Sequence, residues 1–401
     1  MHDRVRKVCR AVADFARSDE DMHPKNRVAV SSMFGTANTI SSVERLARHD
    51  RRHAASVNQW DQDPWLINTP GGIVDLRTGK ISAPSPDRYM TKITSVSPRG
   101  ECPTWISFLQ EATGNDPELI EFLQRMAGYS LTGLTIEQKF FFFYGSGGNG
   151  KGTFLNTLTA IFNDYAKVAS VDMLTETRGD RHPTELAALR GARMVTAQEV
   201  EEGRRWAEAK LKMLTGSDPI TARFMRQDEF EFIPQLKLII AGNHKPGLRN
   251  VDEAIRRRFL LIPFTVKPRV KDLMLGEKLM AESGGILRWC IEGCLKWQAG
   301  GLGEPASVHK ATEEYFETED RIGQWISDCC DVAVSFTCKS SDMYKSFKEW
   351  SEANGEFVIS QKRWAQQMSS RGFESNRSSA GVVYRGITVS KDHGPDWHDQ
   401  D

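Results

Sequence analysis

The strongest constraint on this chain is a glycine-rich run that joins an aromatic segment to an amphipathic one. Residues 140–144 read Phe-Phe-Phe-Phe-Tyr, and residues 145–153 read Gly-Ser-Gly-Gly-Asn-Gly-Lys-Gly-Thr. The order predicts a buried strand, a loop and a helix. Glycines let a backbone wrap around an oxygen-rich anion, so that loop N–H groups and the helix N-terminus face its charge. With Lys151 able to reach the outer phosphates, the spacing predicts a nucleotide-binding loop rather than a plain surface turn.

The loop supplies the residues that we expect to bind ATP. They are Gly145, Ser146, Gly147, Gly148, Asn149, Gly150, Lys151, Gly152 and Thr153. Most loops of this type place a Ser or Thr hydroxyl on Mg²⁺ directly after the lysine. Glycine stands there in this chain, so Thr153 becomes the candidate metal ligand, with water as the alternative.

Composition excludes several function classes. The chain has 401 residues, enough for two to three domains, and its 53 Lys and Arg balance its 53 Asp and Glu. Binding to nucleic acid would therefore require a local basic patch. The seven cysteines lack paired Cys-x-x-Cys spacing, which favours a reducing compartment and no structural zinc. Without a signal-peptide core or a long apolar stretch, we expect a soluble, cytoplasmic protein with no membrane partner.

The pattern along the chain predicts five regions. Residues 1–58 have helical spacing, and residues 59–132 combine short strands and turns with two amphipathic helices. Strands and helices alternate over residues 133–300, which is typical of an α/β nucleotide-binding domain. Residues 301–390 form a C-terminal domain, and the polar residues 391–401 are expected to be disordered. Strands of the α/β region are expected at residues 140–144, 193–197, 236–241 and 259–263. Helices are expected at residues 104–114, 116–130, 270–298, 306–330, 343–353 and 361–370, and a hairpin strand at 382–389.

Hydrolysis needs a carboxylate that orients and deprotonates the attacking water. The expected strand at residues 193–197 runs into Gln198-Glu199, and the carboxyl end of such a strand faces the mouth of the phosphate loop. Glu199 is therefore the candidate general base or ligand of a metal-bound water. The alternative is a solvated acid at a strand end, an interpretation that also fits Glu201 and Glu202.

Asn243 ends the next expected strand. A neutral amide there can hydrogen-bond the γ-phosphate and the water without adding negative charge, so Asn243 is a candidate sensor. It could instead merely start the turn before Pro246, as Asn often does.

Three adjacent arginines, Arg256, Arg257 and Arg258, precede the strand at residues 259–263. An arginine aimed at a phosphate raises the rate of phosphoryl transfer by roughly 10³–10⁵. We assign this role first to Arg258 and second to Arg257. At least one of the three is expected to be a solvated basic residue.

Taken in order, these motifs resemble those of superfamily 3 helicases. They are most similar to the ATPase part of phage and plasmid primase-helicases and of the poxvirus helicase-primase. The resemblance rests on the loop, Gln198-Glu199, residues 212–218, residues 221–226, residues 243–246 and Arg257-Arg258. It implies an AAA+-related homo-hexamer that uses ATP and Mg²⁺ to move 3′ to 5′ on single-stranded DNA. It also implies that Arg258 acts on ATP held by the neighbouring subunit. Gln198 stands where many relatives carry a second acid.

The resemblance further implies a DNA-tracking hairpin between Glu199 and Asn243. The candidate DNA-binding residues are Lys212, Arg223, Phe224 and Arg226, which combine cations with an aromatic group. A solvated hairpin of mixed charge is the alternative, because Asp228, Glu229 and Glu231 follow.

The flanking regions also resemble modules of this family. Residues 341–350, 362–372 and 384–387 resemble the C-terminal winged-helix domain, which contacts either duplex DNA or a protein. Residues 60–132 resemble the collar-type module before the motor, and the polymerising primase half of long relatives is not recognisable.

We therefore expect an ATP-dependent, ring-forming DNA helicase that replicates a phage or mobile element in the host cytoplasm. A separate primase or replication initiator is a further expected partner. The alternatives are a nucleotide-gated DNA-binding or origin-loading module with weak hydrolysis, and an RNA-directed motor.

Overall fold

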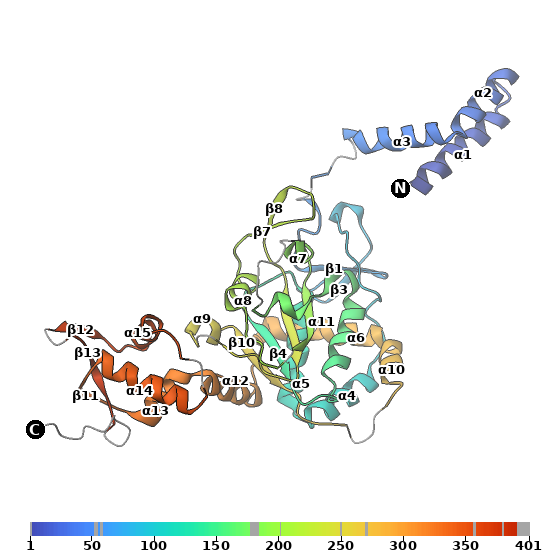
Figure 1. The fold of residues 1–401 in the computed structure, drawn as a ribbon. Helices are drawn as coiled ribbons and strands as arrows, with labels where there is room; N and C mark the ends of the chain where they lie inside the picture. Colours follow the sequence, from blue (N-terminus) through green and yellow to red (C-terminus); the bar gives the residue numbers. More distant parts are fainter. Residues whose placement is uncertain are drawn as a thin grey trace, which may run out of the picture. The chain divides into compact units, whose positions relative to one another are not determined.

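The computed structural model describes residues 2–51, 55–56, 59–176, 184–200, 202–248, 251–268, 272–355, 358–378 and 381–390 (Figure 1). It contains two compact units: residues 1–62 with 86–91, and residues 63–85 with 92–401. The expected disorder of residues 391–401 lies outside the described residues. In the described part of the chain, no helix is both long and apolar enough to cross a membrane.

The first unit is built from helices, as the spacing of residues 1–58 predicts. It contains α1 (His2–Ser18), α2 (Pro24–Phe34), α3 (Ala37–His49) and the 3₁₀ turn η3 (Pro86–Arg88). Cys9, Ala13 and Ala16 recur at helical spacing on α1 and are buried. Thr36 caps α3, because its hydroxyl accepts a hydrogen bond from the backbone N–H of Thr39 at 3.2 Å.

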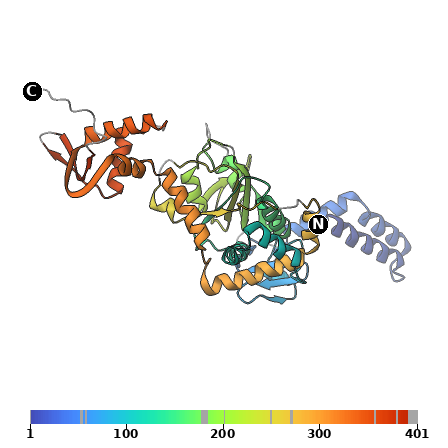
Figure 2. The ribbon, with the colours of Figure 1, turned by 90° about the horizontal axis from the view of Figure 1, so that it is seen from below.

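A parallel five-stranded sheet forms the centre of the second unit (Figures 1 and 2). Its order is β10 (Phe259–Pro263), β4 (Phe140–Tyr144), β9 (Lys237–Gly242), β6 (Met194–Val200) and β5 (Ala166–Val168). All four neighbouring pairs run parallel. The four predicted strands are confirmed to within one residue at their starts and three at their ends. The three-residue edge strand β5 was not predicted, since its length carries no periodic pattern.

The aromatic run in β4 supplies both faces of this sheet, because successive side chains of a strand point in opposite directions. Phe141 and Phe143 enter a core with α4 (Pro103–Thr113), α5 (Pro117–Leu131), α6 (Lys151–Phe162) and α11 (Ser283–Gly300). Phe140 and Phe142 enter a second core with α8 (Glu208–Leu214), α9 (Glu253–Arg256) and α12 (Ala306–Glu319). A strand buried on both faces explains why its sequence is continuously apolar.

Helices α5 and α11 cross at a contact that requires glycine on both sides. A Cβ atom on Gly128 would lie 2.0 Å from the backbone nitrogen of Cys294, and one on Gly293 would lie 2.0 Å from the carbonyl oxygen of Gln124. The two backbones therefore touch, which ties α5, before the sheet, to α11, which follows it.

Smaller elements complete this unit. They are β1 (Leu66–Thr69), β2 (Gly72–Asp75), β3 (Lys80–Ser82), η4 (Asn163–Tyr165), η5 (Val171–Met173), α7 (Thr184–Ala187), β7 (Ile220–Arg223), β8 (Glu229–Phe232) and α10 (Leu275–Ala281). β1, β2 and β3 form an antiparallel sheet, in the region where strands and turns were predicted. β7 and β8 form a separate hairpin.

The C-terminal segment of the unit has its own core. It contains α13 (Arg321–Cys329), β11 (Cys330–Lys339), α14 (Ser340–Ala353), α15 (Gln361–Ser370), β12 (Ser375–Ser378) and β13 (Gly381–Val389). Trp325, Phe347 and Trp364 are buried in it, and the antiparallel strand order is β11-β13-β12.

Two long helices expected from periodicity are interrupted. The stretch at residues 306–330 breaks at Asp320, whose carboxylate accepts the backbone N–H of Gly323 at 3.0 Å and starts α13. The stretch at residues 270–298 divides at Glu282 into α10 and α11. The Glu282 carboxylate accepts hydrogen bonds from the backbone N–H groups of Thr104 (3.0 Å) and Trp105 (3.1 Å), and so caps α4 instead of continuing a helix.

Candidate functional site

The glycine loop connects β4 to α6 at the carboxyl end of the sheet. Gly147, Gly148 and Gly150 have positive φ angles of 85°, 66° and 90°, a conformation that residues with a Cβ atom rarely adopt. At Gly145, an added Cβ would lie 1.9 Å from the carbonyl oxygen of Phe264. The loop can therefore follow its path only with glycine at these positions.

Lys151, the first residue of α6, points into the loop. Its ammonium donates to the carbonyl oxygen of Gly145 (2.7 Å) and to the side-chain oxygens of Asn149 (2.9 Å) and Asn243 (3.2 Å). The lysine is buried, and burial lowers its pKa. Asn149 is also buried and donates from its amide to the carbonyl oxygen of Phe264. An ammonium surrounded by oxygen atoms in this way is prepared for anionic ligands.

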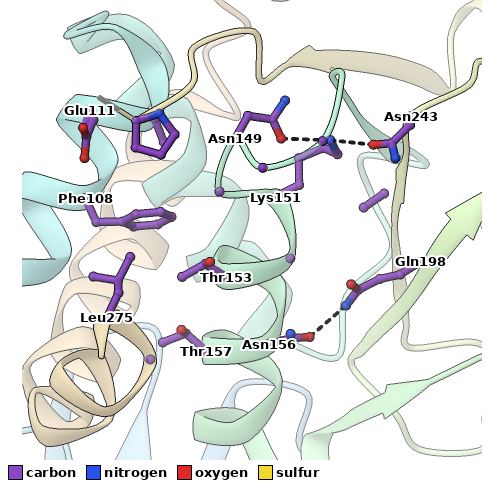
Figure 3. Close-up of a pocket in the computed structure, with 18 of the residues that line it drawn as sticks. Phe108, Glu111, Asn149, Lys151, Thr153, Asn156, Thr157, Gln198, Asn243 and Leu275 are labelled. Carbon is purple, nitrogen blue, oxygen red and sulfur yellow. Dashed lines mark hydrogen bonds between the residues drawn. The ribbon is translucent and has the colours of Figure 1, made fainter. Parts of the chain in front are cut away.

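A cavity of about 1400 Å³ opens beside Lys151 (Figure 3). Its walls come from the loop and α6, from the carboxyl ends of β6 and β9, from α4, and from the segment that leads into α10. Sequence reasoning placed Lys151, Glu199 and Asn243 at one site, and all three line this cavity.

Glu199 lies at an irregularity in β6. Its φ angle is 70°, and the pairing of β6 with β9 shifts register between Gln198 and Val200. A bulge of this kind turns a side chain out of the regular alternation of the strand. Glu199 is exposed and lines the cavity, whereas Val200 is buried. The carboxylate is thus free to meet a ligand at the strand end.

The two sides of α6 face different walls of the cavity. A Cβ atom at Gly152 would lie 3.5 Å from the side-chain oxygen of Gln198, and Gln198 donates to Asn156 at 2.8 Å. Thr153 and Thr157, one turn apart, point toward the wall that carries Leu275 (Figure 3). This placement argues against Thr153 as the Mg²⁺ ligand, because its hydroxyl lies on the side of α6 away from Gln198.

The donor atoms fit a directly bound divalent metal poorly. Gly152 offers no hydroxyl, and Gln198 offers a neutral amide where an acid would be expected. Among the described residues, no cluster of three or more His, Cys, Asp or Glu side chains could hold a metal ion. Glu199 remains as the carboxylate that ends β6, so protein contacts to Mg²⁺ would have to run through that residue and through water.

The three arginines differ in the structure, and their exposure favours Arg257 over Arg258. Arg258 is 7% exposed, and its guanidinium donates to the carbonyl oxygen of Ala254 at 2.9 Å. Burial also lowers its pKa. Arg256 pairs with Glu313 at 3.0 Å. Arg257 is exposed, and its guanidinium has no hydrogen bond or ion pair with any described residue. Arg257 is therefore the better candidate for reaching a phosphate outside the chain.

The candidate DNA-binding residues also separate. Arg223 ends β7, and Phe224 and Arg226 lie in the turn of the hairpin, where Phe224 is 38% exposed and stacks on Phe230 at 5.5 Å. Lys212 lies on α8, where its ammonium pairs with Asp252 at 2.5 Å. That carboxylate also accepts the backbone N–H of Ile255 and caps α9. Lys212 is thus engaged within the chain, which makes it a weaker candidate for DNA binding than Arg223 and Arg226.

Sequence reasoning missed one wall of the cavity. Phe108 and Glu111 on α4, together with Leu275, lie beside the loop although they are distant from it along the chain. Phe108 belongs to a predicted amphipathic helix, a pattern that indicates core packing and not a ligand site. Only the tertiary arrangement could have identified them, since no short motif includes them.

Comparisons with known proteins now bear on this site. Two family models match parts of the chain: "D5 N terminal like" over residues 1–114, and a family of unknown function, DUF5906, over residues 143–258. The second match contains the loop, Glu199, Asn243 and the arginines, whereas α4 lies within the first.

Viral proteins are among the curated relatives. "Putative helicase L207/L206" of Acanthamoeba polyphaga mimivirus is 26% identical over 73% of this chain and 34% of its own length. "Putative helicase 022R" of Frog virus 3 is 26% identical over 58% of this chain and 26% of its own length. The chain thus spans about a third or less of these relatives.

A solved structure shares the fold. The apo NrS-1 C-terminal region has a TM-score of 0.51 and 14% identity, and the match covers 87% of this chain and 90% of that one. The mixed α/β architecture with a parallel sheet is therefore shared with a known structure. The family matches and the viral relatives together support a relationship between this chain and D5-like helicases.

Proposed function

We propose that this chain is the ATP-hydrolysing motor of a superfamily 3 DNA helicase that forms a ring on single-stranded DNA in replication of a phage or mobile element. One observation carries the proposal: Lys151 and the ends of β6 and β9 meet at one cavity beside a glycine loop. The names of the viral relatives support nucleic acid as the partner. Whole-protein activity remains part of the proposal, because the chain spans only part of those relatives.

The arrangement suggests how the residues would divide the work. Phosphate oxygens would replace the three oxygen atoms that now surround the ammonium of Lys151, while N–H groups of the loop and of α6 bind the same anion. Asn243 already hydrogen-bonds Lys151, so its amide lies close enough to detect an outer phosphate. Glu199 would orient and deprotonate water. Bound Mg²⁺ would offset the charge of the phosphates.

The fold supports the same proposal at a coarser level. A phosphate loop after the second strand in spatial order, with helices on both faces of the sheet, is what an AAA+-like core requires. We propose that the helices and strands of residues 321–389 form a winged-helix domain, and that Arg257 acts across a subunit interface in a homo-hexamer. Arg223, Phe224 and Arg226 on the hairpin are the proposed contacts to single-stranded DNA.

Unwinding of a forked DNA duplex tests this function. We expect the wild-type chain to separate the strands with ATP and Mg²⁺, and Lys151→Ala to fail while still folding. Lys167→Ala, which removes an exposed lysine of β5 outside the cavity, serves as the matched control and should unwind normally. Unwinding that survives in Lys151→Ala would reject the loop as the energy source.

A second candidate is favoured by Gly152 and by the neutral pair Gln198–Asn156. A metal site that has no hydroxyl at Gly152 and no acid at Gln198 suits a nucleotide-gated DNA-binding or origin-loading module with little hydrolysis. ATP-dependent binding of the fork without strand separation or phosphate release would favour this module over the motor. Competition between single-stranded DNA and RNA for ATPase stimulation would test an RNA-directed motor.

A further inference from the structure

Asn243 is the first residue after β9, where the sheet no longer holds the backbone. β9 ends at Gly242, and Asn243 and the two residues that follow it are exposed. The side-chain oxygen of Asn243 nevertheless meets the ammonium of Lys151 at 3.2 Å (Figure 3). A residue in this position keeps such a contact only if its loop is held from outside the sheet. We call residues 243–248 the Asn243 loop.

The first hold on the Asn243 loop is a pairing of backbones. The backbone N–H of Gly247 donates to the carbonyl oxygen of Arg204 at 2.9 Å, and the backbone N–H of Trp206 donates to the carbonyl oxygen of Gly247 at 3.0 Å. These bonds join the loop to the segment that follows β6. Because they involve only main-chain atoms, they do not depend on the side chains of the two segments.

Helix α12 supplies the second hold, from two side chains one turn apart. The hydroxyl of Tyr315 donates to the carbonyl oxygen of Pro246 and accepts the indole N–H of Trp206 at 3.1 Å. Burial raises the pKa of Tyr315, so its hydroxyl keeps the proton that it donates. The carboxylate of Glu319 accepts the backbone N–H of Leu248 at 2.6 Å. Residues four apart share one face of a helix, so this face of α12 holds the loop at two points.

Helix α12 is a firm anchor because it is bonded to β10, the edge strand beside β4. The hydroxyl of Thr312 accepts the backbone N–H of Leu261 in β10 at 3.0 Å. Glu313 pairs with Arg256 at 3.0 Å, and the guanidinium of Arg256 lies 4.9 Å from the ring centre of Phe316. The sheet therefore fixes α12, and α12 in turn fixes the Asn243 loop.

We infer that Tyr315 and Glu319 are positioning residues for ATP hydrolysis, because they set the place of the Asn243 amide relative to the outer phosphate. Neither side chain lines the cavity, so each acts through the loop and not on the nucleotide. A displacement of about 1 Å at a group that meets the reacting phosphate lowers the rate by up to about a hundredfold. Binding of ATP at Lys151 should change little. The inference rests on the proposed function and extends it to a helix outside the cavity.

A double-mutant cycle in the full chain separates this role from a merely structural one. We expect Glu319→Ala to lower kcat of the DNA-stimulated ATPase about tenfold, while KM for ATP stays within about threefold of the wild type. Added to Asn243→Ala, the same substitution should change kcat by less than about twofold, because the residue through which it acts is already absent. An equal loss in both backgrounds would overturn the inference, and so would an unchanged kcat in Glu319→Ala alone.

Further variants locate the effect in single hydrogen bonds. Glu319→Gln keeps an oxygen that can accept the backbone N–H of Leu248, and should retain at least about half of the wild-type kcat. Tyr315→Phe removes the hydroxyl but keeps the ring, and should lower kcat only while Asn243 is present. Glu317→Ala is the matched control, because Glu317 is an exposed acid of α12 that does not line the cavity. Its kcat should equal that of the wild type.

Hydrogen exchange gives a readout besides activity. The amide of Leu248 should exchange faster in Glu319→Ala than in Glu317→Ala, with urea midpoints showing that both variants fold. Equal exchange in the two variants, or a Glu319→Gln variant as slow in hydrolysis as Glu319→Ala, would overturn the inference. If the wild type hydrolyses no ATP, the proposed function fails and the inference fails with it. If the wild type hydrolyses ATP and the two substitutions act independently, only the inference fails.

Discussion

Alanine substitutions of Arg257 and Arg258 should give opposite results, because one guanidinium is exposed and the other is buried. Arg258→Ala removes a buried side chain and its part-buried hydrogen bond to the carbonyl oxygen of Ala254. We expect it to lower the free energy of unfolding by about 1–3 kcal/mol. Arg257→Ala removes an exposed side chain and should change stability by no more than about 0.5 kcal/mol.

The rate of ATP hydrolysis should show the opposite order, with the larger direct effect in Arg257→Ala. If Arg257 acts on ATP in the neighbouring subunit, Arg257→Ala should lower the DNA-stimulated ATPase rate by about 10³-fold or more. Urea unfolding measures the free energy of unfolding, and phosphate release measures the ATPase rate. Mixing Arg257→Ala with Lys151→Ala subunits should restore part of the rate, since some interfaces then join two intact halves. Arg257→Ala with nearly normal ATPase activity, or mixtures without recovery at any ratio, would refute the assignment.

Three further predictions follow from single contacts. Lys212→Met should lower the free energy of unfolding by about 0.5–1 kcal/mol through its half-exposed pair with Asp252. It should leave the salt dependence of single-stranded DNA binding unchanged, whereas loss of a phosphate contact would reduce the slope by about 1. In Gly152→Ser the added Cβ would fit at 3.5 Å from the side-chain oxygen of Gln198. The new hydroxyl should lower the Mg²⁺ concentration for half-maximal ATPase activity by about threefold. An unchanged Mg²⁺ titration would contradict this. Burial lowers the pKa of Lys237, so the unfolded chain binds more protons there and stability should rise with pH up to the unfolded pKa near 10.4. Urea midpoints of wild type and Lys237→Met between pH 7 and about pH 10 should therefore diverge in favour of the wild type, and parallel curves would contradict this.

Local patterns predicted the elements that carry the phosphate end of the site. The continuous apolar run at residues 140–144 required a strand buried on both faces, and the glycines that follow required a loop of special backbone conformation. Because parallel strands end at one edge of a sheet, the sequence alone predicts that Glu199 and Asn243 lie beside the loop. Those placements depend only on spacing along the chain.

Contacts between distant segments could not be predicted in the same way. The capping of α4 by Glu282, the pairing of Lys212 with Asp252 and the burial of Arg258 each depend on which elements meet in space. Sequence reasoning ranked Arg258 before Arg257, whereas the structure buries Arg258 and exposes Arg257. The side of α6 on which Thr153 lies could not be predicted for a related reason, since it is fixed only by the packing of the helix.

The rate of ATP hydrolysis with Mg²⁺ and single-stranded DNA, compared between wild type and Lys151→Met, tests the central claim most directly. Because oxygen atoms surround the ammonium of Lys151, we expect this group to bind phosphate. DNA should stimulate hydrolysis by the wild type, and the folded Lys151→Met variant should be at least about a hundredfold slower. Equal rates for the two proteins, or no hydrolysis by the wild type under these conditions, would contradict it.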